Sequence, residues 1–225
     1  TWSEKRLKAG PWDRDGRREV YRKAELSEEQ HRQLVEYCGQ VGVRFLTSCF
    51  SEDDLTFIRT LTNEVKIPSP ECPNRKLVDS ACELFDRVFI STGATCRSEY
   101  APYASRENVY LLHCVSIYPC PAWQVNLPKL KALASLTDRF GYSGHYFGIW
   151  DAIAAISLGA KVIEKHFTTD RSYEYRDNTY ALLPGDLKQI RTYADELDQM
   201  VADSGSDYQE AEEVIRTVYS GRWRG

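Results

Sequence analysis

Two histidines stand where they could share one metal ion. His145 ends the segment 141–145 (Gly-Tyr-Ser-Gly-His), and His166 lies near the end of 162–167 (Val-Ile-Glu-Lys-His-Phe). A helix-like stretch rich in Ala, Ile and Leu separates these two strand-like segments. In a βαβ unit the two parallel strands end on the same side, so both imidazoles could face one divalent metal. A lone histidine in an apolar strand is more often a core residue, but the pair predicts a metal-assisted active site.

The histidines belong to a longer alternation of strand and helix signals. A capping box of Ser27 with Gln30 predicts the start of a helix, and Ser51 with Asp54 predicts another. Further helices are predicted at 76–84 and 126–134, with little helix between 93 and 110. Buried or half-buried strands are predicted at 43–47, 64–67, 88–91, 110–113, 140–142 and 161–164.

This alternation predicts a parallel sheet covered by helices. A dinucleotide-binding version is disfavoured, because no Gly-x-Gly-x-x-Gly turn is present. We therefore interpret the chain as an α/β protein with a (β/α)8 TIM barrel that is incomplete, with about six of the eight βα units present.

Composition and charge exclude several other classes. The chain of 225 residues is 42% hydrophobic and 28% charged, which is ordinary for a globular domain. No apolar run is long enough to span a membrane, and a net charge of −4 gives no electrostatic argument for nucleic acid. The seven cysteines include no Cys-x-x-Cys pair, which favours free thiols. We expect a cytoplasmic protein without a membrane or nucleic-acid partner.

Four segments carry a resemblance to a known family. They are 90–93 (Ile-Ser-Thr-Gly), 112–119 (Leu-His-Cys-Val-Ser-Ile-Tyr-Pro), the Gly-Tyr-Ser-Gly-His segment and 164–168 (Glu-Lys-His-Phe-Thr). Their order and spacing resemble the sialic acid synthase family, which includes legionaminic and pseudaminic acid synthases. The resemblance runs from about residue 26 to about residue 200, and Glu-Lys-His-Phe is its most specific part.

The resemblance implies a domain organisation. In that family a first strand, its helix and a second strand precede the matched region, and an antifreeze-like domain follows the barrel. Residues 1–25 are then expected to be a loop or linker after the missing second strand. Residues 26–203 would form a partial TIM-barrel synthase domain, and 204–225 a C-terminal helix or tail.

The resemblance also implies an activity. Family members condense phosphoenolpyruvate with an N-acetylated hexose such as N-acetylmannosamine, releasing phosphate and a nonulosonic acid. The implied cofactor is a divalent metal, Mn²⁺ or Mg²⁺, with His145 and His166 as its ligands. A homodimer is expected of the complete protein.

Substrate contacts are carried over from the family motifs. The segment 66–71 (Lys-Ile-Pro-Ser-Pro-Glu) resembles the family's Lys-Ile-x-Ser-Gly-Glu, although its two prolines could alter the phosphate cradle. Lys66 and Ser69 are thereby predicted to bind phosphate. Further phosphoenolpyruvate contacts are predicted at the ends of four strands, at Ser48, Ser91, Ser116 and Ser143.

Three carboxylates are predicted to be catalytic on the same grounds, namely Glu71, Glu164 and Asp177. Tyr118 is predicted to shape the sugar side of the site.

The remaining residues near these motifs receive structural interpretations. Gly144 stands where many relatives have Asp, which removes a carboxylate near the histidines. Lys165 should point away from the barrel mouth, since its neighbours in the strand point toward it. His113 is interpreted as a core histidine and His31 as a solvated helix residue.

Two other functions are compatible with the sequence. The chain could be a non-catalytic barrel fragment or interaction subunit that retains the site by descent. It could also be an unrelated metal-dependent barrel such as an aldolase. A Schiff-base aldolase would need a buried lysine at a strand end, and Lys66 is the only good candidate.

Overall fold

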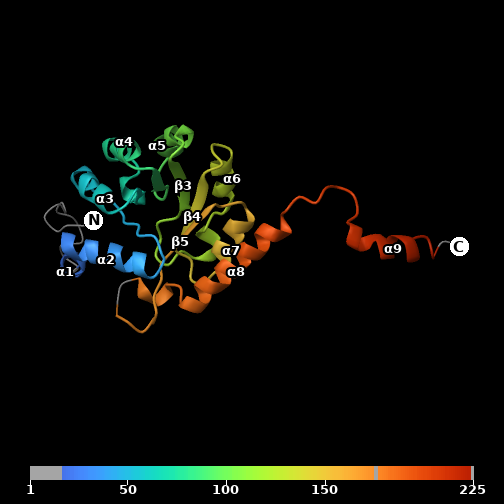
Figure 1. Cartoon of the computed structure of the whole chain (residues 1–225). Coiled ribbons are helices and arrows are strands. Elements are labelled where there is room, and N and C mark those ends of the chain that lie inside the picture. The colour runs from blue at the N-terminus through green and yellow to red at the C-terminus, as the bar shows by residue number, and fades with distance from the viewer. Residues whose placement is uncertain (1–16, 175–176, 224–225) are drawn as a thin grey trace.

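A curled parallel sheet forms the centre of the protein. The structure is a computed structural model that describes residues 17–174 and 177–223. One five-stranded sheet runs in sequence order, with every neighbouring pair parallel (Figure 1). Its strands are β1 (Glu64–Ile67), β2 (Arg87–Ser91), β3 (Val109–Cys114), β4 (Phe140–Gly144) and β5 (Val162–Lys165). This half-barrel confirms the incomplete (β/α)8 barrel that the sequence predicts.

Helices connect the strands and cover the outer side of the sheet (Figure 1). Apart from short 3-10 turns, they are α1 (Arg17–Ala24), α2 (Glu28–Gln40), α3 (Leu55–Leu61), α4 (Arg75–Leu84), α5 (Arg97–Tyr100), α6 (Pro128–Ala134), α7 (Trp150–Ser157), α8 (Pro184–Met200) and α9 (Glu213–Val218). The capping box at Ser27 is present and begins α2. Ser51 makes no capping hydrogen bond, and a 3-10 turn precedes α3 instead.

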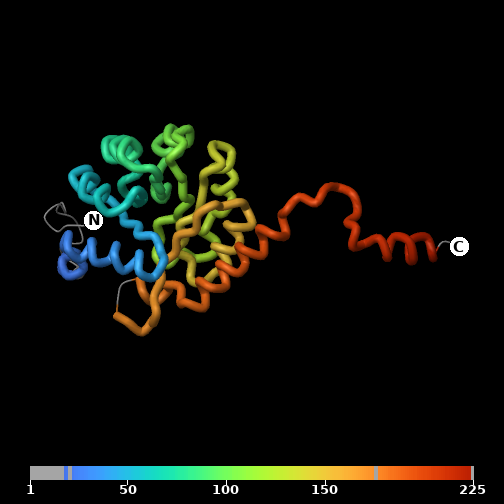
Figure 2. The backbone as a smooth tube through the Cα atoms, viewed as in Figure 1, coloured from blue at the N-terminus to red at the C-terminus, as the bar shows by residue number. Residues whose placement is uncertain are grey.

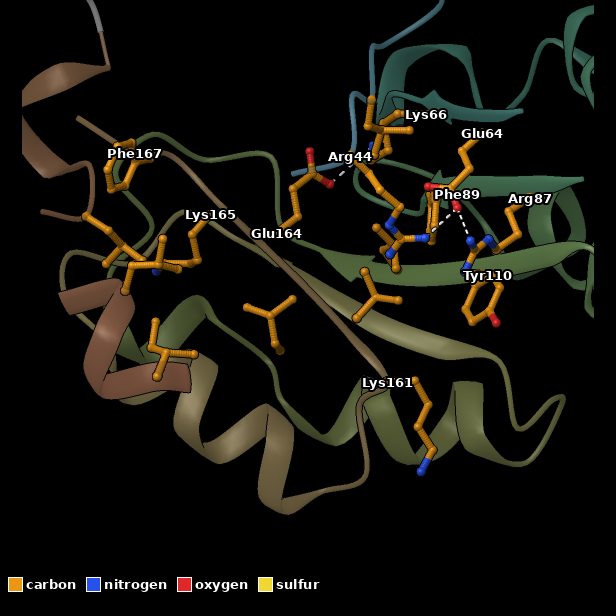
Figure 3. Close-up of a pocket in the computed structure, with 17 residues that line it drawn as sticks. Arg44, Glu64, Lys66, Arg87, Phe89, Tyr110, Lys161, Glu164, Lys165 and Phe167 are labelled. Carbon is orange, nitrogen blue, oxygen red and sulfur yellow. Dashed lines mark hydrogen bonds and ion pairs between the residues drawn. The ribbon is translucent and has the colours of Figure 1, made fainter. Parts of the chain in front are cut away.

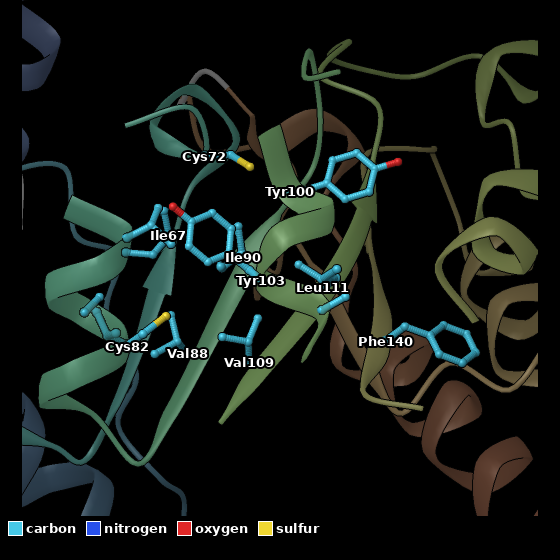
Figure 4. Close-up of a cluster of buried hydrophobic side chains, with 14 of the residues drawn as sticks. Ile67, Cys72, Cys82, Val88, Ile90, Tyr100, Tyr103, Val109, Leu111 and Phe140 are labelled. Carbon is cyan, nitrogen blue, oxygen red and sulfur yellow. The ribbon is translucent and has the colours of Figure 1, made fainter. Parts of the chain in front are cut away.

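The core lies between the sheet and these helices because successive strand side chains point to opposite faces. The strand side chains that point outward pack against Leu77 and Ala81 of α4 and Leu130 of α6. Figure 4 shows part of this cluster. The outward strand residues are Val65, Ile67, Val88, Ile90, Val109, Leu111, Phe140 and Tyr142. The alternate residues, such as Lys66, Phe89, Tyr110 and Leu112, line the concave inner face (Figure 3).

The segment predicted as a buried strand at 43–47 is different in the structure. None of its residues is in a strand, and the residue that follows it, Ser48, forms a parallel bridge with Lys66 of β1. Val43 and Leu46 remain 57% and 44% exposed, so the predicted burial is wrong. The reason is that this segment lies at the sheet edge, and Leu46 faces an inner cavity of about 730 Å³.

A second bridge extends the other edge of the sheet. Phe167, just after β5, pairs in parallel with Leu182. The amide of Leu182 donates to the carbonyl of His166 at 2.7 Å, and the amide of Thr168 donates back to Leu182 at 2.9 Å. These bonds hold the segment after β5 against the sheet, and they fix the backbone around His166.

His31 corrects another expectation. It is only 7% exposed, and its ring meets Phe57 of α3 edge-on with 5.7 Å between centroids. Its Nδ1 atom hydrogen-bonds the carbonyl of Ser27 at 2.8 Å. The prediction of a solvated histidine is therefore wrong, because α2 packs this face against α3.

The ends of the chain differ from the barrel. Residues 1–16 of the expected linker lie outside the described residues, while 17–24 form α1. At the other end α9 projects away from the barrel (Figure 2). None of the helices within the described ranges is long and apolar enough to cross a membrane. None of the seven cysteines, all of which lie in the described ranges, is in a disulfide.

Candidate active site at the carboxyl ends of the strands

The carboxyl ends of the strands enclose a polar pocket of about 410 Å³. All but two of the residues predicted from the sequence line it. They are Ser48, Lys66, Ser69, Ser91, Tyr118, Ser143, His145, Glu164, His166 and Asp177. The parallel topology explains this convergence, because every strand delivers its last residues to the same rim.

The two histidines follow directly on neighbouring strands. His145 comes after β4 and His166 after β5, and their ring centroids are 5.3 Å apart. A metal–nitrogen bond of about 2.1 Å puts a metal about 3.2 Å from a ring centre, so this spacing permits a shared ion. His145 Nδ1 lies 2.9 Å from the carbonyl of Val115. Since a carbonyl only accepts, Nδ1 carries the proton and Nε2 is left for a ligand.

Other groups surround the histidines and tune them. The Tyr118 ring lies 4.0 Å from the His145 ring, and Asp177 Oδ2 lies 3.9 Å from His166 Nδ1. Burial lowers the pKa of His166, although Asp177 opposes the shift, so its ring favours the neutral form that binds metals. Burial also raises the pKa of Tyr118 to about 12, which keeps its hydroxyl protonated.

In the part of the chain that the structure describes, the two histidines are not part of a larger ligand cluster. Within residues 17–174 and 177–223, no group of three or more His, Cys, Asp or Glu side chains is arranged to hold a metal. Two imidazoles fit a divalent ion whose other positions go to water and substrate oxygen. The residues present are therefore compatible with the predicted metal.

Lys66 supplies a buried cation in the pocket. It is only 5% exposed, and its Nζ atom lies 3.5 Å from Glu164 Oε2 (Figure 3). It also donates to the carbonyl of Ile67 at 3.1 Å. Lys66 and Glu164 line both the rim pocket and the inner cavity, so their ion pair lies between the two. A buried ammonium with donors to spare suits an anionic ligand better than a solvated strand-edge lysine would.

Hydroxyl and amide groups lie next to this cation. Ser69 Oγ accepts a hydrogen bond from the amide of Gly93 at 3.0 Å. Ser91 Oγ is buried and, in the described part of the chain, has no hydrogen-bond partner. A Cβ on Gly93 would meet Ser116 Oγ at 2.3 Å, so glycine is needed for this close approach. An unpartnered hydroxyl in a polar pocket is available to a bound anion.

Two predicted residues do not line the pocket. Ser116 Oγ lies 3.9 Å from Cys114 Sγ and close to Gly93. Glu71 accepts a hydrogen bond from Asn74 at 3.0 Å. It ends the 3-10 turn Ser69–Glu71, which turns its side chain toward the start of α4. The prolines of this segment, Pro68 and Pro70, line the pocket and do not close it.

Cys114 is a pocket residue that the sequence reasoning missed. It is the last residue of β3, and its Sγ atom lies 3.9 Å from His145 Nδ1. Burial opposes ionisation, but His145, Ser69 and Ser116 together lower the pKa of this thiol. The signal available in the sequence was its position, since residues at strand ends face the rim.

These features define a (β/α)-barrel protein with a polar site at the strand ends, where barrel enzymes carry their chemistry. The chain belongs to the NeuB family, whose family model matches residues 2–206.

Several relatives in sequence are named as synthases of sialic-acid-type sugars. N,N'-diacetyllegionaminic acid synthase of Campylobacter jejuni is 33% identical over 198 residues, covering 82% of this chain and 58% of that protein. N-acetylneuraminate-9-phosphate synthase of Homo sapiens is 31% identical over 177 residues, covering 75% and 49%. The chain thus spans about half the length of these relatives.

Solved structures agree on the fold. N-acetylneuraminic acid synthetase of Leptospira borgpetersenii superposes with a TM-score of 0.82 at 25% identity, covering 92% of this chain and 76% of that one. A DAHP synthase of Thermotoga maritima gives a TM-score of 0.66 at 16% identity over 77% of this chain and 56% of that chain, which is a likeness of fold alone.

Proposed function

We propose that this chain forms the catalytic part of a nonulosonic acid synthase that condenses phosphoenolpyruvate with an N-acetylated hexose of the N-acetylmannosamine type. One observation carries the proposal. A single rim pocket combines a buried lysine with two adjacent histidines, so it offers an anion site and a metal site side by side. The names of the sequence relatives support the product class.

The anion half of the pocket suits phosphoenolpyruvate. Its phosphate and carboxylate need a fixed cation and several neutral donors. Lys66 supplies the cation, while Ser69 and the unpartnered Ser91 supply hydroxyls. Since Lys66 already faces Glu164, a bound phosphate would take over part of the charge that Glu164 now balances.

The histidine half suits the sugar. His145 and His166 would hold the divalent metal, Mn²⁺ or Mg²⁺, which when bound supplies Lewis-acid polarisation of the sugar aldehyde. Glu164 lies between the two halves, with its side chain 45% exposed. We assign it the orientation of the water that adds to C2 of phosphoenolpyruvate before phosphate leaves. Asp177 faces the His166 ring, and we assign Tyr118 to the sugar side.

The activity belongs to a complete protein of the family. The inner face of the half-barrel is open, and the chain covers about half of its relatives. Both sheet edges end in single bridges that a further strand could extend. Homodimer formation and a location in the cytoplasm also remain predictions.

Metal binding tests the histidine assignment. Titration with Mn²⁺, followed by electron paramagnetic resonance, should show one bound ion in the wild type and none in His166→Ala. His31→Gln is the control, since His31 lies outside the pocket and glutamine can keep its bond to Ser27. Equal binding by His166→Ala and the wild type would remove the metal site from the proposal.

A trapping experiment separates the aldolase alternative. A Schiff-base aldolase would be modified at Lys66 by pyruvate with borohydride, whereas the proposed synthase forms no imine. Mass spectrometry showing pyruvate on Lys66 would overturn the proposed chemistry.

A further inference from the structure

A buried polar network lies beside the two histidines and is not used by the proposed chemistry. Lys165, the last residue of β5, donates to both carboxylate oxygens of Asp151 in α7, at 2.9 and 2.8 Å. The hydroxyl of Tyr142 in β4 donates to Asp151 Oδ2 at 2.9 Å. The Lys165 and Asp151 side chains are 5% and 2% exposed. The carboxylate thus accepts three hydrogen bonds away from solvent.

Each member of this network is close in sequence to a histidine of the site. Lys165 directly precedes His166 and also donates to the carbonyl of Tyr146 at 2.7 Å. Tyr146 directly follows His145. One ammonium group therefore fixes the backbone after His145 and the strand end before His166, with α7 as the common anchor.

Gly144 is part of the same arrangement. A Cβ at this position would lie 2.5 Å from Asp151 Oδ2 and 2.4 Å from Tyr142 Cε1. Contacts this short cannot be accommodated without moving the carboxylate or the ring. The absence of a side chain at residue 144 is what lets Asp151 reach Tyr142 and Lys165 from the helix.

A gain in stability does not by itself explain the buried ion pair of Lys165 and Asp151. Desolvation offsets most of the attraction in a buried ion pair, and replacing both partners by apolar residues is often neutral. A fully satisfied polar network does, however, hold its members in one geometry. Geometry matters here because the two imidazoles must keep their spacing to share a ligand.

We propose that Tyr142, Asp151 and Lys165 form a positioning network that sets the relative placement of His145 and His166. The proposal rests on the proposed function insofar as the histidines form a metal site. None of the three residues lines the rim pocket, so we assign them an action through the histidines.

The main test replaces the ion pair by apolar residues in Asp151→Leu/Lys165→Met. Side-chain ¹H–¹⁵N NMR can follow all four histidines of the chain individually. We expect the signals of His145 and His166 to shift and broaden, while that of His31, which packs on Phe57 of α3, stays in place. Where Mn²⁺ binds the wild type, its affinity should fall about 10- to 100-fold.

Two further variants make the result decisive. Asp79→Leu/Arg106→Met removes a half-exposed ion pair elsewhere and should leave the His145 and His166 signals unchanged. Tyr142→Phe removes one hydroxyl, keeps the ring, and should give the same shifts in smaller size even if the double variant does not fold.

Unchanged His145 and His166 signals in folded Tyr142→Phe, or in the folded double variant, would overturn the positioning role. The NMR measurement needs no metal. A wild type that binds no Mn²⁺ would therefore count against the proposed function. The His145 and His166 signals would still test the positioning role of the network.

Discussion

The buried histidine His113 makes the stability of this protein depend on pH in a defined window. Its ring is fully buried in β3, and Nε2 donates to the carbonyl of Val125 at 2.8 Å. Its Nδ1 atom has no hydrogen-bond partner among the described residues. Burial lowers the pKa of His113 to about 4, because an imidazolium here would bring an unsatisfied charge into the core. The interpretation of His113 as a core histidine is confirmed.

The sign and size of the effect follow from this lowered pKa. An unfolded histidine titrates near pH 6.5, so between pH 6.5 and about 4 the unfolded chain binds more protons than the folded one. The free energy of unfolding is therefore not reduced by His113 above this window, and it decreases as the pH falls through the window. Between pH 7 and pH 5 the loss is about 2 kcal/mol.

The substitution His113→Gln isolates this contribution. Glutamine can still donate to Val125 but does not titrate in the window, so the variant should lose about 2 kcal/mol less than the wild type between pH 7 and pH 5. Urea unfolding followed by circular dichroism at pH 7, 6 and 5 measures both free energies. Parallel pH profiles for the two proteins would refute the reasoning, whatever their absolute stabilities.

Three further predictions concern the site. In a complete barrel, Lys66→Ala should raise KM for phosphoenolpyruvate about ten- to hundredfold, since it removes a charge-assisted contact, and His145→Ala should mainly lower kcat. Steady-state kinetics with excess metal check both, and lost turnover at unchanged KM in Lys66→Ala would contradict phosphate binding. The 225-residue chain alone should release phosphate from phosphoenolpyruvate and N-acetylmannosamine at a negligible rate, and gain activity when the missing strands are supplied in cis or in trans. Robust release by the isolated chain would argue against this. Gly144→Ala should lower the melting temperature, because its Cβ would displace Asp151; an unchanged melting curve would contradict the tight packing.

The sequence determined the order of elements and most of the rim. Strand and helix periodicity is local, so the parallel strands and the capped start of α2 follow from neighbouring residues. Parallel strands end at one rim, so strand-end residues such as Lys66, His145 and His166 could be expected to converge without knowledge of their contacts. The Glu-Lys-His-Phe motif indicated the family because its residues are contiguous and can be recognised without the fold.

Only the tertiary structure decided which side chains are buried and which residues are their hydrogen-bond or ion-pair partners. Asp151 lies on a helix and reads as an ordinary polar residue until α7 packs it against Lys165. His31 becomes buried because α3 covers it, and 43–47 stays exposed because nothing described here covers the inner face at that edge. Burial and hydrogen-bond partners depend on residues far apart in the chain, and these long-range contacts are what local patterns cannot specify.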